Sequence, residues 1–313
     1  MMTNFSQFVI SSFNATMGYN STENPGKSNR SQNYVKVYYS IIVLIVSLIS
    51  FSGLVGNGRV IWLLGFHIKK NPFTTYILSL SIADFGVLTV QVPLYILIVI
   101  YFFEGITRDF LFHWGFLLLS NLLPTFTASQ LLLTVISIDR CVCIFFPLWH
   151  RCHRPTHLST AVCVVIWIIT FLIFATDITL KVSINYSKLL SILFAFNAVL
   201  FMPIMCVATT VILIKICLSS QLKKKGKLIR ATLFTLVFFI LFAFPINAFY
   251  IFNFFKLQYR EFSIYVYICF TLNSTINPII YYFVGRGKRG KFCKGINKVL
   301  EKLFKEEEDY REQ

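Results

Sequence analysis

Seven long hydrophobic segments, separated by short polar ones, dominate the pattern along the chain. They cover roughly residues 37–66, 72–101, 110–143, 158–180, 189–217, 229–255 and 262–284. Each is long enough to cross a bilayer, which takes about 20 apolar residues in a helix. Backbone polar groups inside lipid must bond to one another, so the segments are predicted to be helices. The predicted fold is an all-α integral membrane protein, a seven-transmembrane helix bundle over residues 37–284.

Composition and charge agree with this pattern and orient the bundle. Of the 313 residues 56% are hydrophobic and only 13% are charged, against about 25% charged in soluble domains. Most Lys and Arg outside the spans fall in one set of alternate loops and the carboxyl-terminal tail, including Lys69, Lys70, Arg151, Arg154 and the run Lys223-Lys224-Lys225. Short loops rich in Lys and Arg face the cytoplasm. We therefore expect a multi-pass protein of the plasma membrane with its amino terminus outside.

Most of the net charge of +16 is explained by basic residues expected at the inner face of the membrane. Anionic lipids there attract basic residues beside a span by about 1 kcal/mol each. Membrane lipids are thus the expected partner of these charges, and nucleic-acid binding is not expected.

Residues 1–36 form a polar amino-terminal tail. They contain four Asn-x-Ser/Thr acceptors, at Asn4, Asn14, Asn20 and Asn29. Such acceptors are glycosylated only in a lumenal or extracellular segment. The tail is predicted to be extracellular and glycosylated at these asparagines.

Residues 285–313 form the predicted cytoplasmic end of the chain. Hydrophobic residues recur there at helical spacing with lysines between them, at Phe292, Ile296, Val299, Leu300 and Leu303. This pattern is typical of a short amphipathic helix on the membrane surface, which would be an eighth helix after the seven spans. Cys293 on this segment is a candidate for palmitoylation, with a free thiol as the alternative.

Several polar residues lie inside the predicted spans, where they are costly and usually functional. Asp84 is in the middle of the second span, and Ser129, Asn273 and Asn277 lie in others. They indicate a polar site within the membrane. The alternative is an interhelical hydrogen-bond network that only stabilises the bundle.

Taken together, a set of short motifs resembles the rhodopsin-like (class A) G protein-coupled receptors along roughly residues 37–305. These motifs are GN at 56–57, LSLSIAD at 78–84, DRC at 139–141, Trp167, Pro203, Pro245 and NPIIY at 277–281. Within that class the stretches KNPFTTYILSLSIAD at 70–84 and FPLWHRCHRP at 146–155 are similar to the Mas-related receptor family. The resemblance implies a receptor that binds an extracellular ligand and activates heterotrimeric G proteins.

The resemblance also implies a switch at the cytoplasmic end of the third span. Arg140 would be held by Asp139 at rest and released toward a G protein on activation. Tyr281 would swing inward, and Pro245 and Pro278 would kink the spans that move. Many class A receptors add an acid near the inner end of the sixth span, where this chain reads LKKKGKL. Without that acid, appreciable basal activity is expected.

Two ligand sites follow from the same resemblance. Asp84, Ser129, Asn273 and Asn277 match the sodium pocket of class A receptors, so an allosteric sodium ion is possible there, and no other cofactor is expected. Asp177 matches a position at which some Mas-related receptors carry an acid that binds cationic peptides and drugs. A cationic peptide or amphiphile is therefore the expected ligand. The alternative for Asp177 is pairing with Lys181, one helical turn further on.

Other function classes fit the sequence less well. A polytopic transporter or channel is the alternative function, but it would usually show internal repeats or broken helices. An enzyme is not expected, because the few acids inside the spans lack a His or Cys at hydrolase spacing.

Overall fold

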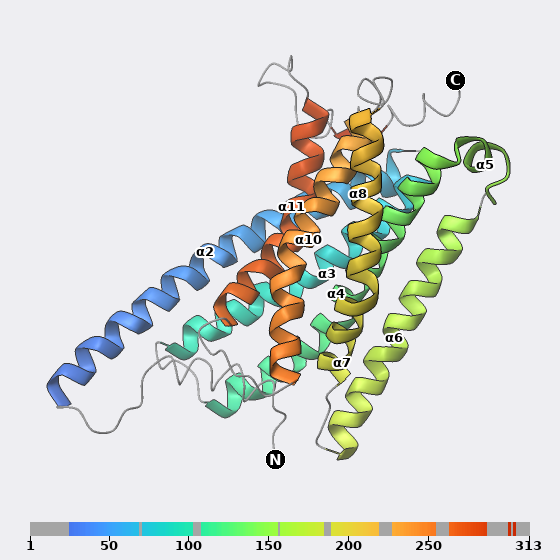
Figure 1. The fold of residues 1–313 in the computed structure, drawn as a ribbon. Helices are drawn as coiled ribbons and strands as arrows, with labels where there is room; N and C mark the ends of the chain where they lie inside the picture. The colour runs from blue at the N-terminus through green and yellow to red at the C-terminus, as the bar shows by residue number, and fades with distance from the viewer. Residues whose placement is uncertain are drawn as a thin grey trace.

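Long helices make up nearly all of the described chain. The computed structural model describes residues 25–68, 71–102, 108–155, 157–184, 189–218, 227–254, 263–286, 300–301 and 303–304. Figure 1 shows the helices running side by side as one bundle. In these ranges six helices are long and apolar enough to cross a membrane, and a seventh contains the shorter apolar stretch Ile268–Val284. The fold is the predicted all-α bundle of seven membrane helices.

The helix bounds lie close to the predicted spans. The membrane helices are α2 (Pro25–Phe66), α3 (Pro72–Phe102), α4 (Arg108–Phe145), α6 (Leu158–Ile184), the continuous run α7 (Leu189–Phe196), η1 (Asn197–Phe201) and α8 (Met202–Leu218), α10 (Lys227–Phe254) and α11 (Ser263–Arg286). A short helix, α5 (Pro147–Cys152), joins α4 to α6. The main difference is at the start of α2, which begins at Pro25 although its membrane-length apolar stretch begins only at Ser40. The first helix therefore extends beyond the predicted tail boundary at residue 36 and includes Asn29.

The fifth span contains a local departure from α-helical geometry. Residues Asn197–Phe201 form one π-helical segment just before Pro203. Proline has no amide hydrogen to donate and crowds the preceding turn, so a widened turn at this point is understandable. The sequence predicted a kink at Pro203 in this span, but not a π-helical segment before it.

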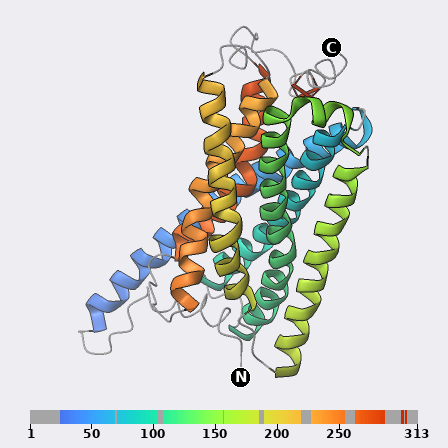
Figure 2. The same ribbon diagram turned by 45° about the vertical axis from the view of Figure 1, so that its right-hand side comes forward.

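Helices α3 and α4 lie at the centre of the bundle. Helix α3 packs against α2, α4, α6 and α11, and α4 also packs against α6, α8 and α10. Helix α6 lies at the outside in Figures 1 and 2, where the amino-terminal part of α2 also projects away from the other helices. Helix α3 carries Asp84, and helix α4 carries Asp139 and Arg140 near its end. Both candidate polar sites therefore lie on the two central helices of the bundle.

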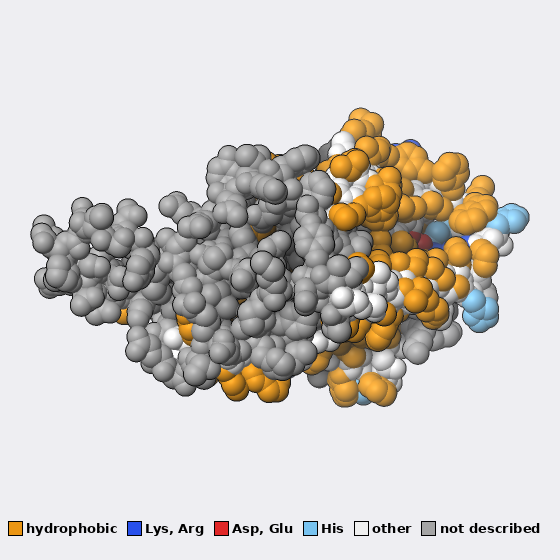
Figure 3. All heavy atoms as spheres, turned by 90° about the horizontal axis from the view of Figure 1, so that it is seen from below, with side chains coloured by type: hydrophobic (Ala, Val, Ile, Leu, Met, Phe, Trp, Pro, Cys, Tyr) orange, Lys and Arg blue, Asp and Glu red, His pale blue; other side chains and the backbone are white. Residues whose placement is uncertain are grey.

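Hydrophobic side chains cover the outside of this bundle. Figure 3, which looks from the end opposite the carboxyl terminus, shows them over most of the described atoms. On α6 alone the exposed residues include Val165, Ile168, Phe171 and Leu172. Buried positions, by contrast, include many polar side chains, among them Asp84, Asn57, Ser129 and Asn277. Apolar outside and polar inside is the arrangement expected of helices packed in lipid.

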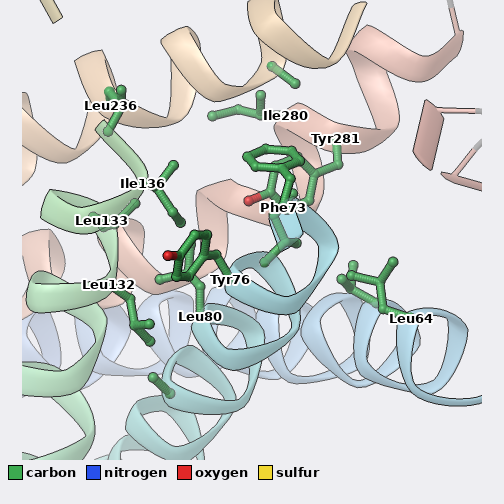
Figure 4. Close-up of a cluster of buried hydrophobic side chains, with 14 of the residues drawn as sticks. Leu64, Phe73, Tyr76, Leu80, Leu132, Leu133, Ile136, Leu236, Ile280 and Tyr281 are labelled. Carbon is green, nitrogen blue, oxygen red and sulfur yellow. The ribbon is translucent and has the colours of Figure 1, made fainter. Parts of the chain in front are cut away.

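At the end of the bundle that lies nearest the carboxyl terminus of the chain, one cluster of buried hydrophobic side chains connects most of the helices. Its members include Leu64, Phe73, Leu80, Leu133, Leu236 and Tyr281, which Figure 4 labels. Leu300, Leu303 and Phe304 from the tail belong to the same cluster and are almost fully buried. Leu300 and Leu303 of the predicted eighth helix thus pack against the bundle, whereas Phe292, Cys293, Ile296 and Val299 lie outside the described residues.

Candidate functional site

An ion pair lies at the end of α4. Arg140 Nη2 donates to Asp139 Oδ2 at 3.1 Å, and the two side chains are only 3% and 8% exposed. Charged groups so well shielded from water need a partner, because an unpaired buried charge is strongly unfavourable. The sequence prediction that Asp139 holds Arg140 is therefore compatible with this geometry.

A second arginine, from the segment after α5, binds the same carboxylate. Arg154 Nη2 lies 2.7 Å from Asp139 Oδ1, and it also donates to Ser159 Oγ at 2.7 Å. His150 Nε2 is 3.8 Å from Asp139 Oδ1 and bonds to the guanidinium of Arg154. Each carboxylate oxygen of Asp139 thus has its own arginine, and the α5 segment is tied to α4. The sequence predicted Arg154 to lie on the cytoplasmic side but did not connect Arg154 or His150 with Asp139.

The other polar centre surrounds Asp84, which is fully buried in α3. Ser129 Oγ of α4 donates to Asp84 Oδ1 at 2.8 Å, and Asn277 Nδ2 of α11 donates to Asp84 Oδ2 at 2.7 Å. Three helices therefore meet at one carboxylate, which brings together Asp84, Ser129 and Asn277, three of the four residues named from the sequence. Asn273 is also buried, but its amide forms no hydrogen bond within the described part of the chain.

A monovalent cation fits the composition of this centre. Two neutral donors satisfy the hydrogen-bonding capacity of Asp84 only in part, and they leave a carboxylate's charge uncompensated where water is scarce. The carboxylate and the Ser129 hydroxyl provide oxygen ligands, which hard cations prefer. The unbonded amide of Asn273 adds another oxygen among the same helices.

Helix α11 is distorted by Pro278 within it. Pro278 has no amide hydrogen, so the carbonyl of Ser274, one turn earlier, loses its helical donor. Asn57 Nδ2 of α2 donates to that carbonyl at 3.0 Å and to the carbonyl of Gly53 at 3.0 Å. The kink is therefore stabilised by a side chain from another helix. Pro245 lies within α10 in the same way.

Tyr281, three residues after Pro278, is buried in the hydrophobic cluster near the end of the bundle. Its ring centroid lies 5.8 Å from that of Phe304 in the tail. Sequence reasoning did not include Phe304 in the apolar stripe of the tail, although it follows Leu303 directly.

The chain matches a family model described as the 7 transmembrane receptor (rhodopsin family) over residues 56–281. Proto-oncogene Mas of Rattus norvegicus is 31% identical over 288 residues, which cover 87% of this chain and 86% of that protein. The chain belongs to the Mas-related receptors of the rhodopsin family. Mas-related G-protein coupled receptor member H of Rattus norvegicus is 30% identical over 298 residues, 91% of this chain and 89% of the relative. Member B2 of Mus musculus is 28% identical over 272 residues, 83% and 79% of the two chains.

This membership settles the broad function. The protein is a multi-pass membrane receptor of the G protein-coupled type and is not an enzyme. The match begins at Gly56 and ends at Tyr281, so it includes both the Asp84 centre and the Asp139–Arg140 pair. The transporter or channel alternative is not favoured.

Asp177, the predicted ligand-binding acid of the receptor, lies in α6 and is fully buried. The Asp177 side chain is therefore closed to solvent in this conformation. The side chain of Lys181, the alternative partner of Asp177, lies outside the described part of the structure.

A buried amide pair links the fifth and sixth spans of the receptor. Asn197 Nδ2, at the start of the π-helical segment, donates to Asn247 Oδ1 at 3.0 Å, and Asn247 Nδ2 donates to the carbonyl of Ala243 at 2.9 Å. Sequence reasoning missed this pair. The signal was present, because both asparagines are polar residues inside apolar spans, like Asp84.

The remaining predicted site residues cannot be placed. Asn4, Asn14, Asn20 and Cys293 lie outside the described residues, and the side chain of Asn29 is also not described.

Proposed function

We propose that this Mas-related receptor lies in the plasma membrane with its amino terminus outside, binds a cationic peptide or amphiphile, and activates heterotrimeric G proteins. The distribution of Lys and Arg supports the orientation, since most of those outside the spans fall in one set of alternate loops and in the carboxyl-terminal tail, and basic short loops face the cytoplasm. The four glycosylation acceptors Asn4, Asn14, Asn20 and Asn29 support an extracellular tail.

The buried Asp139–Arg140 ion pair is the observation that carries the coupling step. In this conformation the guanidinium of Arg140 is enclosed and bound. Activation releases it toward the G protein, while the helices kinked by Pro245 and Pro278 change their packing and Tyr281 leaves the hydrophobic cluster. A bent helix can change its angle without losing the hydrogen bonds of its two straight parts, which favours the proline positions as pivots.

Two substitutions in the ion pair test this proposal with opposite expected signs. Arg140→Ala removes the group that meets the G protein, so signalling should be lost while surface expression and ligand binding persist. Asp139→Asn removes the charge that retains Arg140, so signalling without ligand should increase. Both are measured as second-messenger production per receptor at the cell surface. Full signalling by Arg140→Ala would contradict the proposed switch.

The Asp84 centre is the proposed site of an allosteric sodium ion. When bound, the ion supplies positive charge to the carboxylate. Asp84, Ser129, Asn273 and Asn277 would hold the ion, and the three helices that carry these residues would thereby be kept together. An ion that favours the resting packing lowers the affinity for agonists, by the reciprocity of linked equilibria.

Asp177 is the proposed contact for the cationic ligand. The support is a carboxylate enclosed within a predominantly apolar helix, where pairing with a cation is most favourable. Screening basic peptides and cationic amphiphiles on cells that express chimeric G proteins would identify an agonist. If neutral or acidic compounds alone activate the receptor, this part of the proposal is wrong.

An epitope tag placed before Asn4 tests the orientation. It should be stained on intact cells, and a glycosidase should increase the electrophoretic mobility of the receptor. Staining only after permeabilisation would contradict the assignment of the amino terminus to the outside.

A further inference from the structure

The guanidinium of Arg140 has a second contact besides its ion pair with Asp139. Its central carbon lies 3.7 Å from the centroid of the Phe73 ring, which belongs to the first turn of α3. Both side chains are buried, Phe73 completely and Arg140 to all but 3%. The edge of the guanidinium thus binds Asp139 while its face lies on an aromatic ring.

The start of α3 is well fixed, and this fixes the position of the ring. Asn71 Oδ1 accepts the backbone N–H groups of Phe73 and Thr74 at 3.0 and 2.8 Å, and the N–H of Asn71 donates back to Thr74 Oγ1 at 2.9 Å. Pro72 occupies the first helical position, where its fixed φ angle and missing amide hydrogen are no disadvantage. This reciprocal cap leaves the first turn little freedom to move the ring away.

Stacking on an aromatic ring is suited to holding a guanidinium cation in place. A planar guanidinium stacks well on an aromatic face, and the attraction increases when both groups are removed from water. Helix α10 contains no Asp or Glu between Lys227 and Phe254, so the sixth helix offers no carboxylate of its own to Arg140. The aromatic ring of α3 is in the right place to retain the arginine instead.

We propose that Phe73 is a positioning residue for G protein coupling, which holds Arg140 in its resting place by stacking on the guanidinium. Arg140 must leave this ring before it can reach a G protein. Phe73 thus partly replaces the acid that many receptors of this class carry on the sixth span, and it limits signalling in the absence of ligand. In Figure 4 the ring lies among the buried side chains of the cluster that also contains Tyr281, so Arg140 rests on the same cluster to which Tyr281 belongs. The inference rests on the proposed role of Arg140.

Substitutions that keep or remove the aromatic face test the proposal. Loss of a shielded cation–π contact shifts an equilibrium by roughly fivefold to thirtyfold. Phe73→Leu should increase ligand-independent signalling per surface receptor by that factor, up to the ceiling set by full activation. Phe73→Tyr keeps the ring and should stay within about twofold of wild type. Phe126→Leu, the same change at a buried ring in another cluster, should leave basal signalling unchanged. Phe73→Met serves in place of Phe73→Leu if the latter does not reach the surface.

A second measurement does not depend on G protein coupling. The thermal unfolding midpoint of the purified receptor is measured for Phe73→Leu, Arg140→Gln and the double variant. If the ring stacks on the guanidinium, Phe73→Leu should lower the midpoint less in the Arg140→Gln background than in wild type, because one partner is already missing. The two effects on the midpoint could prove non-additive while Arg140→Ala leaves signalling unchanged. In that case the contact between Phe73 and Arg140 exists, and the proposed switch is wrong. Equal basal signalling by Phe73→Leu and Phe73→Tyr, an equal increase from Phe126→Leu, or strictly additive midpoints would overturn the proposal.

Discussion

Gly56 is predicted to be intolerant of even one added methyl group. A Cβ at this position of α2 would lie 2.9 Å from Pro278 Cβ and 3.2 Å from Pro278 Cγ. The proline ring is rigid and belongs to the kinked part of α11, so it cannot rotate away as a flexible side chain would. Helices α2 and α11 would have to separate by several tenths of an ångström, which would also strain the hydrogen bond from Asn57 to the Ser274 carbonyl.

The size of the effect is the difference between two terms. Overpacking in a close contact costs about 1–3 kcal/mol, and replacing Gly by Ala within a helix returns about 0.5–1 kcal/mol. The net destabilisation by Gly56→Ala is therefore between about 0 and about 2.5 kcal/mol, with about 1 kcal/mol at the middle of both ranges. A loss of about 1 kcal/mol corresponds to a fall of about 2–4 °C in the unfolding midpoint.

Two glycines of the same helix are matched controls. A Cβ at Gly65 would meet nothing within 4 Å, and one at Gly58 would be 3.5 Å from the nearest atom of Phe85, an ordinary contact. Gly65→Ala and Gly58→Ala should therefore raise the midpoint by about 1–3 °C, since only the gain in helix propensity remains. The midpoint is measured by thermal unfolding of purified receptor in detergent. A rise for Gly56→Ala equal to that for Gly65→Ala would refute the close packing of α2 on α11.

Three further predictions concern polar side chains inside the bundle. Asp84→Asn should abolish the difference in agonist affinity between sodium and choline buffers in radioligand binding; a persisting difference would place the ion elsewhere. Asp177→Asn should lower the potency of a basic peptide agonist in dose–response curves by about tenfold to about a hundredfold. Lys181→Ala should not lower this potency. Equal potency of the agonist on Asp177→Asn and on wild type would exclude Asp177 as the ligand contact. Asn247→Leu should lower the unfolding midpoint because it leaves Asn197 unsatisfied, and adding Asn197→Leu should restore part of the loss; a further drop in the double variant would contradict this reasoning.

Sequence pattern was sufficient for the bundle and for the Asp84 centre. The apolar segments predicted most helix ends to within a few residues, because lipid leaves a spanning backbone no alternative to the helix. Asp84, Ser129 and Asn277 could be assigned to one site because few polar residues occur in the spans and because the motifs around them resemble a known family. The positions of these side chains then follow from the helix order.

The contacts around Arg140 were not predictable in the same way. Only the pairing of Arg140 with its chain neighbour Asp139 was predicted. Phe73 lies at a helix start and Arg154 in the segment after α5, and their contacts with this pair depend on how the helices pack, not on local spacing. The start of α2 at Pro25 was missed for a different reason. Hydropathy identifies the part of a helix that lies in lipid, here from Ser40, and gives no signal for a polar continuation outside it. For the π-helical turn in the fifth span, Pro203 marks the place in the sequence, but no local pattern distinguishes a π-helical turn from a simple kink.

Nucleotide exchange on a purified G protein is the most direct test of the central claim, that this Mas-related receptor activates G proteins through Arg140. Wild-type receptor and Arg140→Ala are each placed in lipid bilayer discs with heterotrimers of several Gα classes, and uptake of a non-hydrolysable GTP analogue is measured with and without a basic peptide agonist identified by screening. Wild-type receptor should accelerate uptake on at least one class, more strongly with the agonist, and Arg140→Ala should leave uptake at the rate of empty discs. Equal acceleration by wild-type receptor and Arg140→Ala would contradict the account.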